Sequence, residues 1–474
     1  MTSLKHYDAI AIGTGSVMAV VNGLIQYNPD AKVAVIDKDR PGGICLTKGC
    51  IPSKILVYPA ELISDIEKAK ELGIDVEIKG VNFGKIMGRM RKIVDEDVKE
   101  IERALEEHPN IDYYRDVAMF TAPYQLKVGN ERIRAEKIFI GSGSKPLIPG
   151  IKGLGEAGFI TSDTLLQLEE MPESLAIIGG GYIAVEYGNF FARLGCDVKI
   201  VEMFPRILYN EEPELSQAVQ DELGRIAEIH TSHKVVEVRK GNGLKKVVAV
   251  DSEGNKKEME AEEVLVAAGR TSNSDILKPE NGGIKTDPRG WILVNEYLET
   301  SMPGVYALGD AIGKHMFKHV ANHEARIILE NAVLGRRKMM NYDVVPHAAF
   351  TQPEIASVGL KEAEAIDRYG KDNVLIGYER YETTGKGLAM NAKGFVKVIV
   401  RKDGRILGAH IAGKYASIMI QEIVNVMAAN AGVSLVLEAM HIHPALSEAV
   451  MWAFGNLMEV EEYHRMLAEF GISG

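Results

Sequence analysis

The chain has 474 residues, which at roughly 150 residues per domain corresponds to about three domains. Apolar residues make up 46% and charged residues 26% of it, a composition that excludes a disordered or fibrous protein. The 66 Asp and Glu residues outnumber the 55 Lys and Arg residues, and the net charge of −11 argues against binding to nucleic acid or to anionic membranes.

Residues 7–12 form an apolar run typical of a buried parallel strand, followed by the turn Gly13-Thr14-Gly15 and a helical pattern over residues 16–27. A second strand, residues 32–36, ends at Asp37. The glycines let backbone amides approach a pyrophosphate, and Asp37, 24 residues after Gly13, can accept hydrogen bonds from a ribose. This pattern predicts dinucleotide binding. No apolar run reaches the roughly 20 residues that a membrane span needs.

The same pattern recurs 166 residues later. Its parts are a strand over residues 174–178, the turn Gly179-Gly180-Gly181, a helix over residues 182–194 and a strand over residues 197–201 that ends at Glu202. A carboxylate at Glu202 suits a ribose 2′-hydroxyl and repels a 2′-phosphate, which favours NAD over NADP, although the nearby Arg206 weakens that argument. Two such units predict two doubly wound nucleotide-binding domains.

Further elements are predicted along the rest of the chain. They are a charged helix over residues 82–107 and three buried strands, residues 133–140 before Ser142 and Gly143, residues 263–268 before Gly269, and residues 305–308 before Asp310. After residue 344 the period of the hydrophobic pattern changes. Strands over residues 395–400 and 406–411 flank the hairpin signal Asp403-Gly404, and helices follow from Ser417, so a separate α+β domain is predicted.

The cysteines are few and two of them are close together. Three cysteines cannot build a disulfide framework, which favours a reducing, cytoplasmic compartment. Cys45 and Cys50 precede Pro52, which is expected to open a helix, so the helix end and Lys54 favour a thiolate at Cys50. Two free thiols or half a zinc site are the alternatives, but no second ligand cluster is evident. The pair is most simply a redox disulfide, and Cys196 is assigned no role.

Histidines supply the last candidate site. His443, followed five residues later by Glu448 across Pro444, can be oriented by that carboxylate as a general base, although a buried structural His is commoner. Another three histidines recur at four-residue spacing, as metal ligands on one helix face would: His315, His319 and His323. The helix there is expected to begin near Lys318, which removes His315 from the face, and no metal site is predicted.

Together these residues resemble the flavin-dependent pyridine-nucleotide disulfide oxidoreductases, the family of dihydrolipoamide dehydrogenase, glutathione reductase and mercuric reductase. The resemblance covers essentially the whole chain and is strongest in Gly-Gly-x-Cys-x4-Cys-Ile-Pro-Ser-Lys and in the terminal His-Pro-x-x-Ser-Glu. It implies FAD held by Gly13, Gly15, Asp37, Gly43, Lys54, Ala118, Ser142, Gly143, Asp310 and His319. It implies NAD(P)H held by Gly179, Gly181, Tyr182, Glu202 and Gly269, with Tyr182 as a gate of the nicotinamide pocket.

The resemblance also implies the domain order and the assembly. The fold class is α/β, with two doubly wound, Rossmann-like domains and a C-terminal α+β dimerisation domain. The expected boundaries are 1–150 for the first part of the FAD-binding domain, 151–276 for the NAD-binding domain, 277–343 for the second, central part and 344–474 for the dimerisation domain. The family implies a homodimer with shared active sites, and it places Lys54 beside the flavin, paired with Glu186.

Three residues depart from the family pattern: Met18 at the third glycine position, Ile44 for the Thr usual before the first Cys, and Pro59, which is expected to interrupt the active-site helix. Mercuric reductases carry a second Cys pair near the C-terminus, and large thioredoxin reductases a redox tail. Residues 463–474 contain no Cys, which disfavours both.

The expected function is electron transfer between NAD(H), FAD, the Cys45–Cys50 disulfide and a small dithiol, with dihydrolipoamide as the leading substrate. Cys50 is expected against the flavin, Cys45 exchanges with the substrate, and the partner's His443, oriented by Glu448, moves the proton. One alternative is an NADH-dependent reductase of another small disulfide, glutathione- or mycothiol-like, which Tyr182 would suit. Another is a structural flavoprotein subunit of a multienzyme complex, such as a 2-oxoacid dehydrogenase complex.

Overall fold

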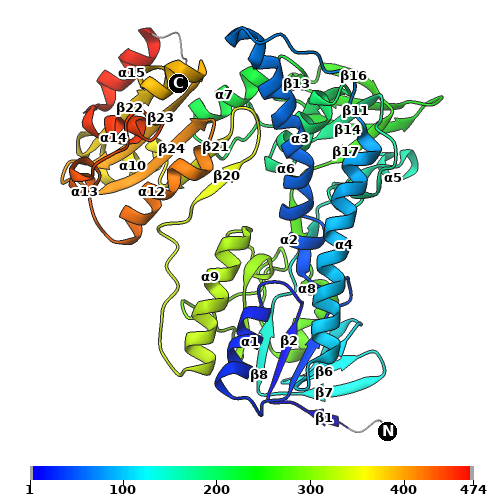
Figure 1. Cartoon of the computed structure of the whole chain (residues 1–474). Coiled ribbons are helices and arrows are strands. Elements are labelled where there is room, and N and C mark those ends of the chain that lie inside the picture. Colours follow the sequence, from blue (N-terminus) through cyan, green and yellow to red (C-terminus); the bar gives the residue numbers. More distant parts are fainter. Residues whose placement is uncertain (1–3, 470–474) are drawn as a thin grey trace.

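The computed structural model describes residues 4–469. Its N-terminal part is built on a five-stranded parallel sheet, two strands of which, β2 and β8, are labelled in Figure 1. The strand order is β19-β8-β2-β3-β4. The strands are β2 (Ala9–Ile12), β3 (Val33–Ile36), β4 (Ile111–Tyr114), β8 (Lys137–Ile140) and β19 (Val305–Ala307). Their helices are α1 (Met18–Tyr27), α4 (Phe83–Glu107) and α9 (Lys318–Ile328). Every residue of β2 and β3 is buried, as expected for strands covered on both faces.

A small second sheet, β1-β7-β6-β5, lies beside the first. Its strands are β1 (Leu4–His6), β5 (Ala118–Ala122), β6 (Gln125–Val128) and β7 (Glu131–Arg134). The single strand expected over residues 133–140 is therefore wrong. β7 pairs with β1 and β6, whereas β8 pairs with β2 and β19, and the polar Glu136 and Lys137 stand at the change of sheet. Two short strands that follow each other closely, with no Gly or Pro between them, resemble one longer strand in the sequence.

The middle of the chain forms a second parallel sheet of order β10-β17-β11-β12-β13. Its strands are β10 (Ile160–Thr161), β11 (Ser174–Ile178), β12 (Asp197–Val201), β13 (Glu228–His230) and β17 (Glu263–Val266). Helices α5 (Leu154–Ala157), α6 (Tyr182–Arg193), α7 (Pro213–Leu223) and α8 (Ser274–Leu277) belong to this region. An antiparallel sheet adds β14 (Lys234–Lys240), β15 (Lys245–Val250) and β16 (Lys256–Ala261), and β9 (Ser144–Pro146) pairs with β18 (Arg270–Ser272) where the chain enters and leaves.

The C-terminal part is a six-stranded antiparallel sheet of order β20-β21-β24-β23-β22-β25. Its strands are β20 (His347–Ala349), β21 (Ile355–Gly359), β22 (Val374–Arg380), β23 (Gly394–Arg401), β24 (Ile406–Gly413) and β25 (Leu457–Glu459). Its helices are α10 (Glu362–Tyr369), α11 (Gly385–Met390), α12 (Ala416–Ala428), α13 (Val433–Glu438), α14 (Glu448–Gly455) and α15 (Val460–Glu469). The α+β architecture expected here is confirmed.

Two helices carry the cysteines: α2 (Gly43–Thr47) and α3 (Cys50–Ala69). The expectation that Pro59 interrupts the second of them is wrong, because α3 continues through Pro59 as one helix beside α4 (Figure 1). Proline removes one backbone donor, to the carbonyl four residues earlier, but the helix ladder closes on both sides of it. The short turns of helix are η1 (Lys70–Leu72), η2 (Leu165–Gln167), η3 (Pro279–Gly282), η4 (Gly309–Ile312), η5 (Leu329–Val333), η6 (Lys371–Asn373) and η7 (Tyr381–Thr383).

The largest apolar core joins parts that are far apart in the sequence. Leu56 of α3, Met87 of α4, Phe190 of α6, Ile376 of β22 and Tyr463 of α15 belong to one buried cluster. The first parallel sheet has a separate core of its own. Apolar burial thus holds the second parallel sheet, the cysteine-bearing helix and the C-terminal sheet together. Among residues 4–469, no helix combines the length and the apolar character that crossing a bilayer requires.

Candidate active site

A cleft of about 2770 Å³ passes the carboxyl ends of both parallel sheets. Open α/β sheets bind their ligands at this edge, because the turns there expose backbone amides and helix N-termini. Almost all the residues singled out in the sequence line it. They are Gly13, Gly15, Asp37, Gly43, Cys45, Cys50, Lys54, Ala118, Ser142, Gly143, Gly179, Gly181, Tyr182, Glu186, Glu202, Gly269, Asp310 and His319. His443 and Glu448 are not among the lining residues.

The first glycine turn is closely packed against its neighbours. Gly13 has a φ of +100°, and a Cβ built there would lie 2.3 Å from the carbonyl oxygen of Gly141. Asp37 Oδ2 accepts hydrogen bonds from the Thr14 backbone N–H at 2.9 Å and from the Thr14 hydroxyl at 2.5 Å, which fixes the turn to the end of β3. Burial raises the pKa of Asp37, and the Thr14 bonds oppose that rise.

These residues fit the dinucleotide end of FAD. Gly43 packs so tightly on Gly15 that a Cβ on Gly43 would come within 2.6 Å of the Gly15 Cα, so the backbone is closely approached on this side of the turn. The Ser142 hydroxyl is buried and has no hydrogen-bond partner within the described chain, which leaves a donor for a bound group. Ile44 reaches the same turn, since a Cβ on Gly143 would lie 2.8 Å from its Cδ1.

The second glycine turn repeats the arrangement with a different acid. Gly179 has a φ of +110°, and a Cβ there would lie 2.4 Å from the Ala267 carbonyl oxygen. Glu202 is buried and accepts hydrogen bonds from the backbone N–H groups of Gly180 at 2.5 Å and Phe204 at 2.8 Å. Arg206 donates to the carbonyl oxygens of Tyr209 and Glu211 and lies over the Tyr209 ring, so its charge is engaged away from Glu202.

The two cysteines meet where α2 ends and α3 begins. Both are free thiols in this structure, and Cys50 is the first residue of α3. The hydrogen bond from Cys45 lowers the pKa of Cys50 most; burial opposes this effect, Lys54 reinforces it, and the pKa falls to about 6. The same hydrogen bond, together with burial, raises the pKa of Cys45. The pair therefore holds one proton on Cys45 and a thiolate at Cys50 at neutral pH.

Lys54 joins three parts of the chain at this point. Its Nζ lies 2.7 Å and 2.9 Å from the two carboxylate oxygens of Glu186 on α6, so the expected pair is present. Glu186 is buried and also accepts a hydrogen bond from the Phe350 backbone N–H at 3.1 Å. Lys54 Nζ stands 4.5 Å from the centre of the Phe350 ring. This set of contacts holds a positive charge within one helical turn of the Cys50 sulfur.

His443 and Glu448 form a pair on the outer face of the C-terminal part. His443 Nδ1 and Glu448 Oε1 are 2.9 Å apart, and the other carboxylate oxygen accepts from the Ala445 backbone N–H at 3.0 Å. The hydrogen bond from His443 lowers the pKa of Glu448. The His443 side chain is 73% exposed, so its Nε2 faces outward, and within one chain this pair is not brought to the cysteines.

The three spaced histidines have separate surroundings. His319 Nε2 lies 2.7 Å from the Pro346 carbonyl oxygen, and His315 stacks on Tyr342. The predicted start of a helix near Lys318 is confirmed by α9, which leaves His315 outside it. Within residues 4–469, no group of three or more His, Cys, Asp and Glu side chains is arranged to hold a metal ion.

Sequence reasoning missed two polar residues beside Tyr182. The Tyr182 hydroxyl donates to Glu211, and His347 Nε2 lies 2.9 Å from the same carboxylate oxygen. Glu211 follows β12 and His347 begins β20, so the residues are 136 positions apart and no local pattern links them. The local sequence offers only a group of acidic residues at the approach to α7, Glu211, Glu212 and Glu214, which does not single out Glu211.

Comparison with known proteins gave matches over nearly the whole chain. The pyridine nucleotide-disulphide oxidoreductase family model matches residues 7–325, and the model for that family's dimerisation domain matches residues 345–454. Mycothione reductase of Mycobacterium tuberculosis is 33% identical over 94% of this chain and 98% of its own. Dihydrolipoyl dehydrogenase of Chlamydia pneumoniae is 30% identical over 96% and 97%. The solved HOCl-induced flavoprotein disulfide reductase RclA of Escherichia coli superposes with a TM-score of 0.84 at 27% identity, over 95% and 99% of the two chains.

Proposed function

The chain belongs to the pyridine nucleotide-disulphide oxidoreductase family, and from this premise we propose that it transfers electrons between NAD(H) and a small dithiol, dihydrolipoamide. The family uses FAD and NAD(P)H, and its dimerisation domain supports homodimer formation. The observation that carries the proposal is the unequal pair of thiols beside Lys54, because a thiolate at Cys50 next to a protonated Cys45 is the reduced form of a redox disulfide.

FAD would be held by the Gly13–Gly15 turn, Asp37, Gly43, Ser142 and Asp310. When bound, it supplies two-electron transfer between a nicotinamide and a disulfide. The hydrogen bond from Cys45 and, after it, the charge of Lys54, which Glu186 holds in place, favour an anionic Cys50 sulfur. In the oxidised chain a substrate thiolate attacks the Cys45 sulfur, the Cys45–Cys50 bond breaks, and Cys50 leaves as the thiolate with the lower pKa. The second substrate thiol then displaces Cys45, so a substrate disulfide forms and both cysteines are reduced.

The proton steps fall to His443 of the partner chain. Glu448 holds its Nδ1 at 2.9 Å, which leaves the outward Nε2 to take the proton of the incoming thiol and to return it in the reverse direction. A free thiol has a pKa near 8.5 and is mostly protonated at neutral pH, so such a base accelerates the exchange by about 10² to 10⁴-fold. The single chain places His443 on an exposed face, which is where a partner would meet it.

Two observations support the choices of dithiol and nicotinamide. The exposed side of α3 next to Cys50 carries Ile51, Tyr58 and Leu62, an apolar stripe that suits an uncharged dithiol better than a charged peptide. Glu202 is buried against its turn and Arg206 is engaged by carbonyl oxygens, which supports NAD over NADP.

The second candidate is an NADH-dependent reductase of another small disulfide, mycothiol-like or glutathione-like. It is favoured by Tyr182, which stands in the cleft, and by the likeness to mycothione reductase. The proposal includes docking to a 2-oxoacid dehydrogenase complex, because dihydrolipoamide is carried on such complexes. It also includes a cytoplasmic location, because the chain has only three cysteines.

The deciding experiment is a steady-state assay of the purified holoprotein with four substrates under both NAD⁺ and NADH: dihydrolipoamide, lipoamide, glutathione disulfide and mycothiol disulfide. The proposal expects the highest kcat/KM with the lipoamide pair and loss of that activity in Cys45→Ser. A higher kcat/KM with mycothiol disulfide selects the second candidate. Activity with none of the four overturns the proposal.

A further inference from the structure

The Tyr182 tether, defined as Tyr182, Glu211 and His347, connects the second glycine turn to the C-terminal sheet. We propose that Glu211 and His347 are positioning residues that hold the Tyr182 ring across the nicotinamide path, so that the dinucleotide must break this contact to reach the cysteine end of the cleft. The inference rests on the proposed use of NAD(H) in this cleft and adds the residues that set its affinity.

Glu211 is saturated with donors although it is only 3% exposed. One carboxylate oxygen receives the Tyr182 hydroxyl and lies 2.9 Å from His347 Nε2, and the other accepts from the Ser357 hydroxyl at 2.8 Å. Burial alone would raise the pKa of Glu211, but the hydrogen bonds from His347, Tyr182 and Ser357 lower it to about 2. The acceptor is therefore a full negative charge, and hydrogen bonds to a charge are stronger than those between neutral groups.

The Tyr182 ring lies between two walls of the cleft. Tyr182 is the first residue of α6, directly after the glycine turn, and its ring centre is 6.1 Å from both Phe317 and His347, which meet it edge to face. Phe317 precedes α9 and stacks on His347 at 5.6 Å. All three residues line the cleft. The ring thus connects the residue that follows the glycine turn with Phe317 and His347 inside the cleft.

The position of Tyr182 on α6 places it between the second glycine turn and Lys54. Glu186 is four residues further along the same helix, so both side chains lie on one helix face. Glu186 is the residue that binds Lys54, one turn from Cys50. A nicotinamide that starts at the Gly179–Gly181 turn and extends toward Lys54 therefore passes Tyr182.

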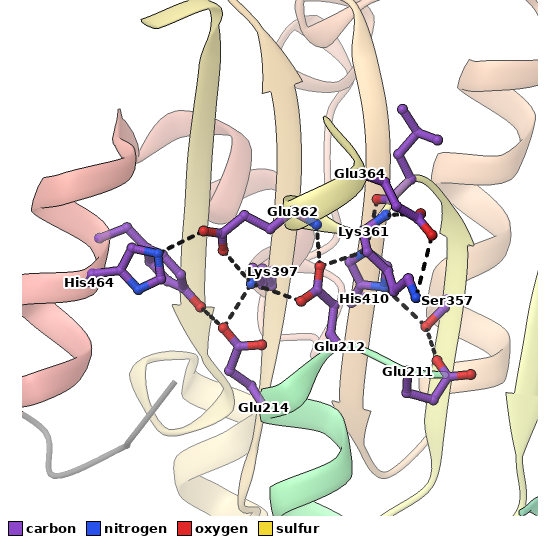
Figure 2. Close-up of polar contacts among 12 residues, drawn as sticks. Glu211, Glu212, Glu214, Ser357, Lys361, Glu362, Glu364, Lys397, His410 and His464 are labelled. Carbon is purple, nitrogen blue, oxygen red and sulfur yellow. Dashed lines mark hydrogen bonds and ion pairs between the residues drawn. The ribbon is translucent and has the colours of Figure 1, made fainter. Parts of the chain in front are cut away.

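Glu211 cannot follow the ring when it moves, because its own segment is bound to the C-terminal sheet (Figure 2). Lys397 on β23 is 1% exposed and contacts Glu214 at 2.7 Å, Glu362 at 2.8 Å and Glu212 at 3.3 Å. Burial alone would lower the pKa of Lys397, but these three carboxylates raise it above its usual range. Removing either side of such a buried pair leaves an uncompensated charge, so the segment is firmly anchored.

A second line of contacts reaches Glu211 itself. Ser357, which donates to Glu211, lies 3.1 Å from His410 Nδ1, and His410 is buried beside Glu212 (Figure 2). Glu212 in turn accepts from the Glu362 backbone N–H at 2.5 Å. The acceptor of the tether is thus fixed to β21, β24 and α10, and these contacts do not include the Tyr182 side chain.

The test measures NAD⁺ binding to the oxidised holoenzyme by calorimetry, which reads affinity without turnover. Tyr182→Phe keeps the ring and removes the hydroxyl, and Glu211→Gln keeps the shape and removes the charge. Because a hydrogen bond to a charged group is lost in each, the Kd for NAD⁺ should fall about 5- to 20-fold in either variant. KM for NADH should fall similarly, while KM for the disulfide stays unchanged. Tyr27→Phe, at an exposed position, and Glu222→Gln, at a half-buried position where, among the described residues, the carboxylate pairs only with Arg225, are the matched controls and should leave Kd unchanged.

The double variant Tyr182→Phe/Glu211→Gln distinguishes a tether from two independent effects. If Glu211 acts through Tyr182, the double variant has the Kd of either single variant, whereas independent sites multiply their effects. Unchanged Kd values in Tyr182→Phe, or multiplied effects, overturn the inference alone. If Glu211→Gln does not fold, Tyr182→Phe with His347→Gln tests the same contact from its other end. A wild-type holoenzyme that binds neither NAD⁺ nor NADH overturns the proposed function as well.

Discussion

Cys45 and Cys50 carry the same functional group, and their neighbours make them chemically different. Cys50 starts α3 within a turn of Lys54 and receives the Cys45 hydrogen bond, so its pKa is about 6, whereas the pKa of Cys45 is raised. Most of the difference comes from the hydrogen bond between the two sulfurs, and the charge of Lys54 comes after it. The sequence alone indicated the helix end, the lysine and the pairing of the two cysteines, but not that the hydrogen bond between the sulfurs lowers the pKa of Cys50 more than the lysine does.

This ordering of causes predicts different behaviour for two substitutions at Cys45. In Cys45→Ser a donor remains, so Cys50 should titrate near pH 6 and give a long-wavelength absorption band beside the oxidised flavin. In Cys45→Ala the donor is lost, and the midpoint should move toward the ordinary thiol value of about 8.5. Alkylation rates with iodoacetamide against pH, followed at Cys50 by mass spectrometry, measure both midpoints. In Cys50→Ser the remaining thiol is Cys45. A low alkylation midpoint at Cys45, or a long-wavelength band in that variant, would reverse the roles of the two sulfurs.

Glu202 allows a second prediction about a single side chain. Wild type should strongly prefer NADH to NADPH, and Glu202→Ala should reduce the ratio of their kcat/KM values about 10-fold or more, because a charged acceptor for the ribose is lost. The ratio is measured by steady-state kinetics with a saturating disulfide. Equal use of both cofactors by wild type would mean that Arg206 or another cation overrides the carboxylate.

The glycine turns show what a whole strand–turn–helix element contributes. At Gly13 both the positive φ and the Gly141 carbonyl oxygen, which would lie 2.3 Å from any Cβ at this position, demand glycine. At Gly88, inside α4, a Cβ meets no atom within 4 Å. The two positions are therefore a matched pair for the same substitution.

Gly13→Ala should lose FAD, because the turn must shift away from the position that presents its amides to the pyrophosphate. The measurement is the flavin absorbance per polypeptide after purification. Gly88→Ala should retain full flavin and gain about 0.5–1 kcal/mol of stability, since alanine is the better helix former. Equal flavin content in the two variants would remove the turn from the FAD site.

Elements were predictable where one pattern is uninterrupted. β11 and β12 have the predicted bounds, and α4 begins one residue later than predicted because the Asn82 side chain caps it by accepting from the Lys85 N–H. The single strand predicted over residues 133–140 was wrong because the backbone changes sheets at Glu136 and Lys137, and two polar residues alone do not distinguish a break from an exposed part of one strand. The predicted break at Pro59 was wrong for the opposite reason. Proline is a strong local signal for the end of a helix, but the packing of α3 between α4 and α6 overrides it.

At the scale of the whole molecule, the cleft was predictable but its cross-domain contacts were not. Motifs locate the two glycine turns, the cysteines and His443, since each lies in a short string of residues. His347 and Glu211 of the Tyr182 tether, and likewise Lys397 and Glu214, are more than a hundred positions apart, so no local sequence motif predicts their contacts. The domain boundaries at residues 150, 276 and 343, and the roles of the individual site residues, stay predictions.

The proposal that each active site is shared between two chains can be tested in a hybrid dimer. His443→Gln should still let NADH reduce the bound flavin, while dithiol–disulfide turnover falls about 10² to 10⁴-fold. Cys45→Ser should also abolish turnover. A hybrid dimer of the two variants, purified through two different tags, then contains one site with both residues intact and should recover about half of wild-type activity. A hybrid no more active than its parents would show that each chain builds its own site.

The pairing of β19 with β8 has a consequence for how the chain is made. β8 lies between β2 and β19, and the strand that completes this sheet is separated from it by the entire second sheet, residues 160–266. On a ribosome the second sheet has all its strands before residue 305 emerges, while the first still shows β8 as an unpaired edge. The unit that starts the polypeptide therefore finishes folding after the unit inserted into it, and its open edge has to stay free of other strands throughout that interval.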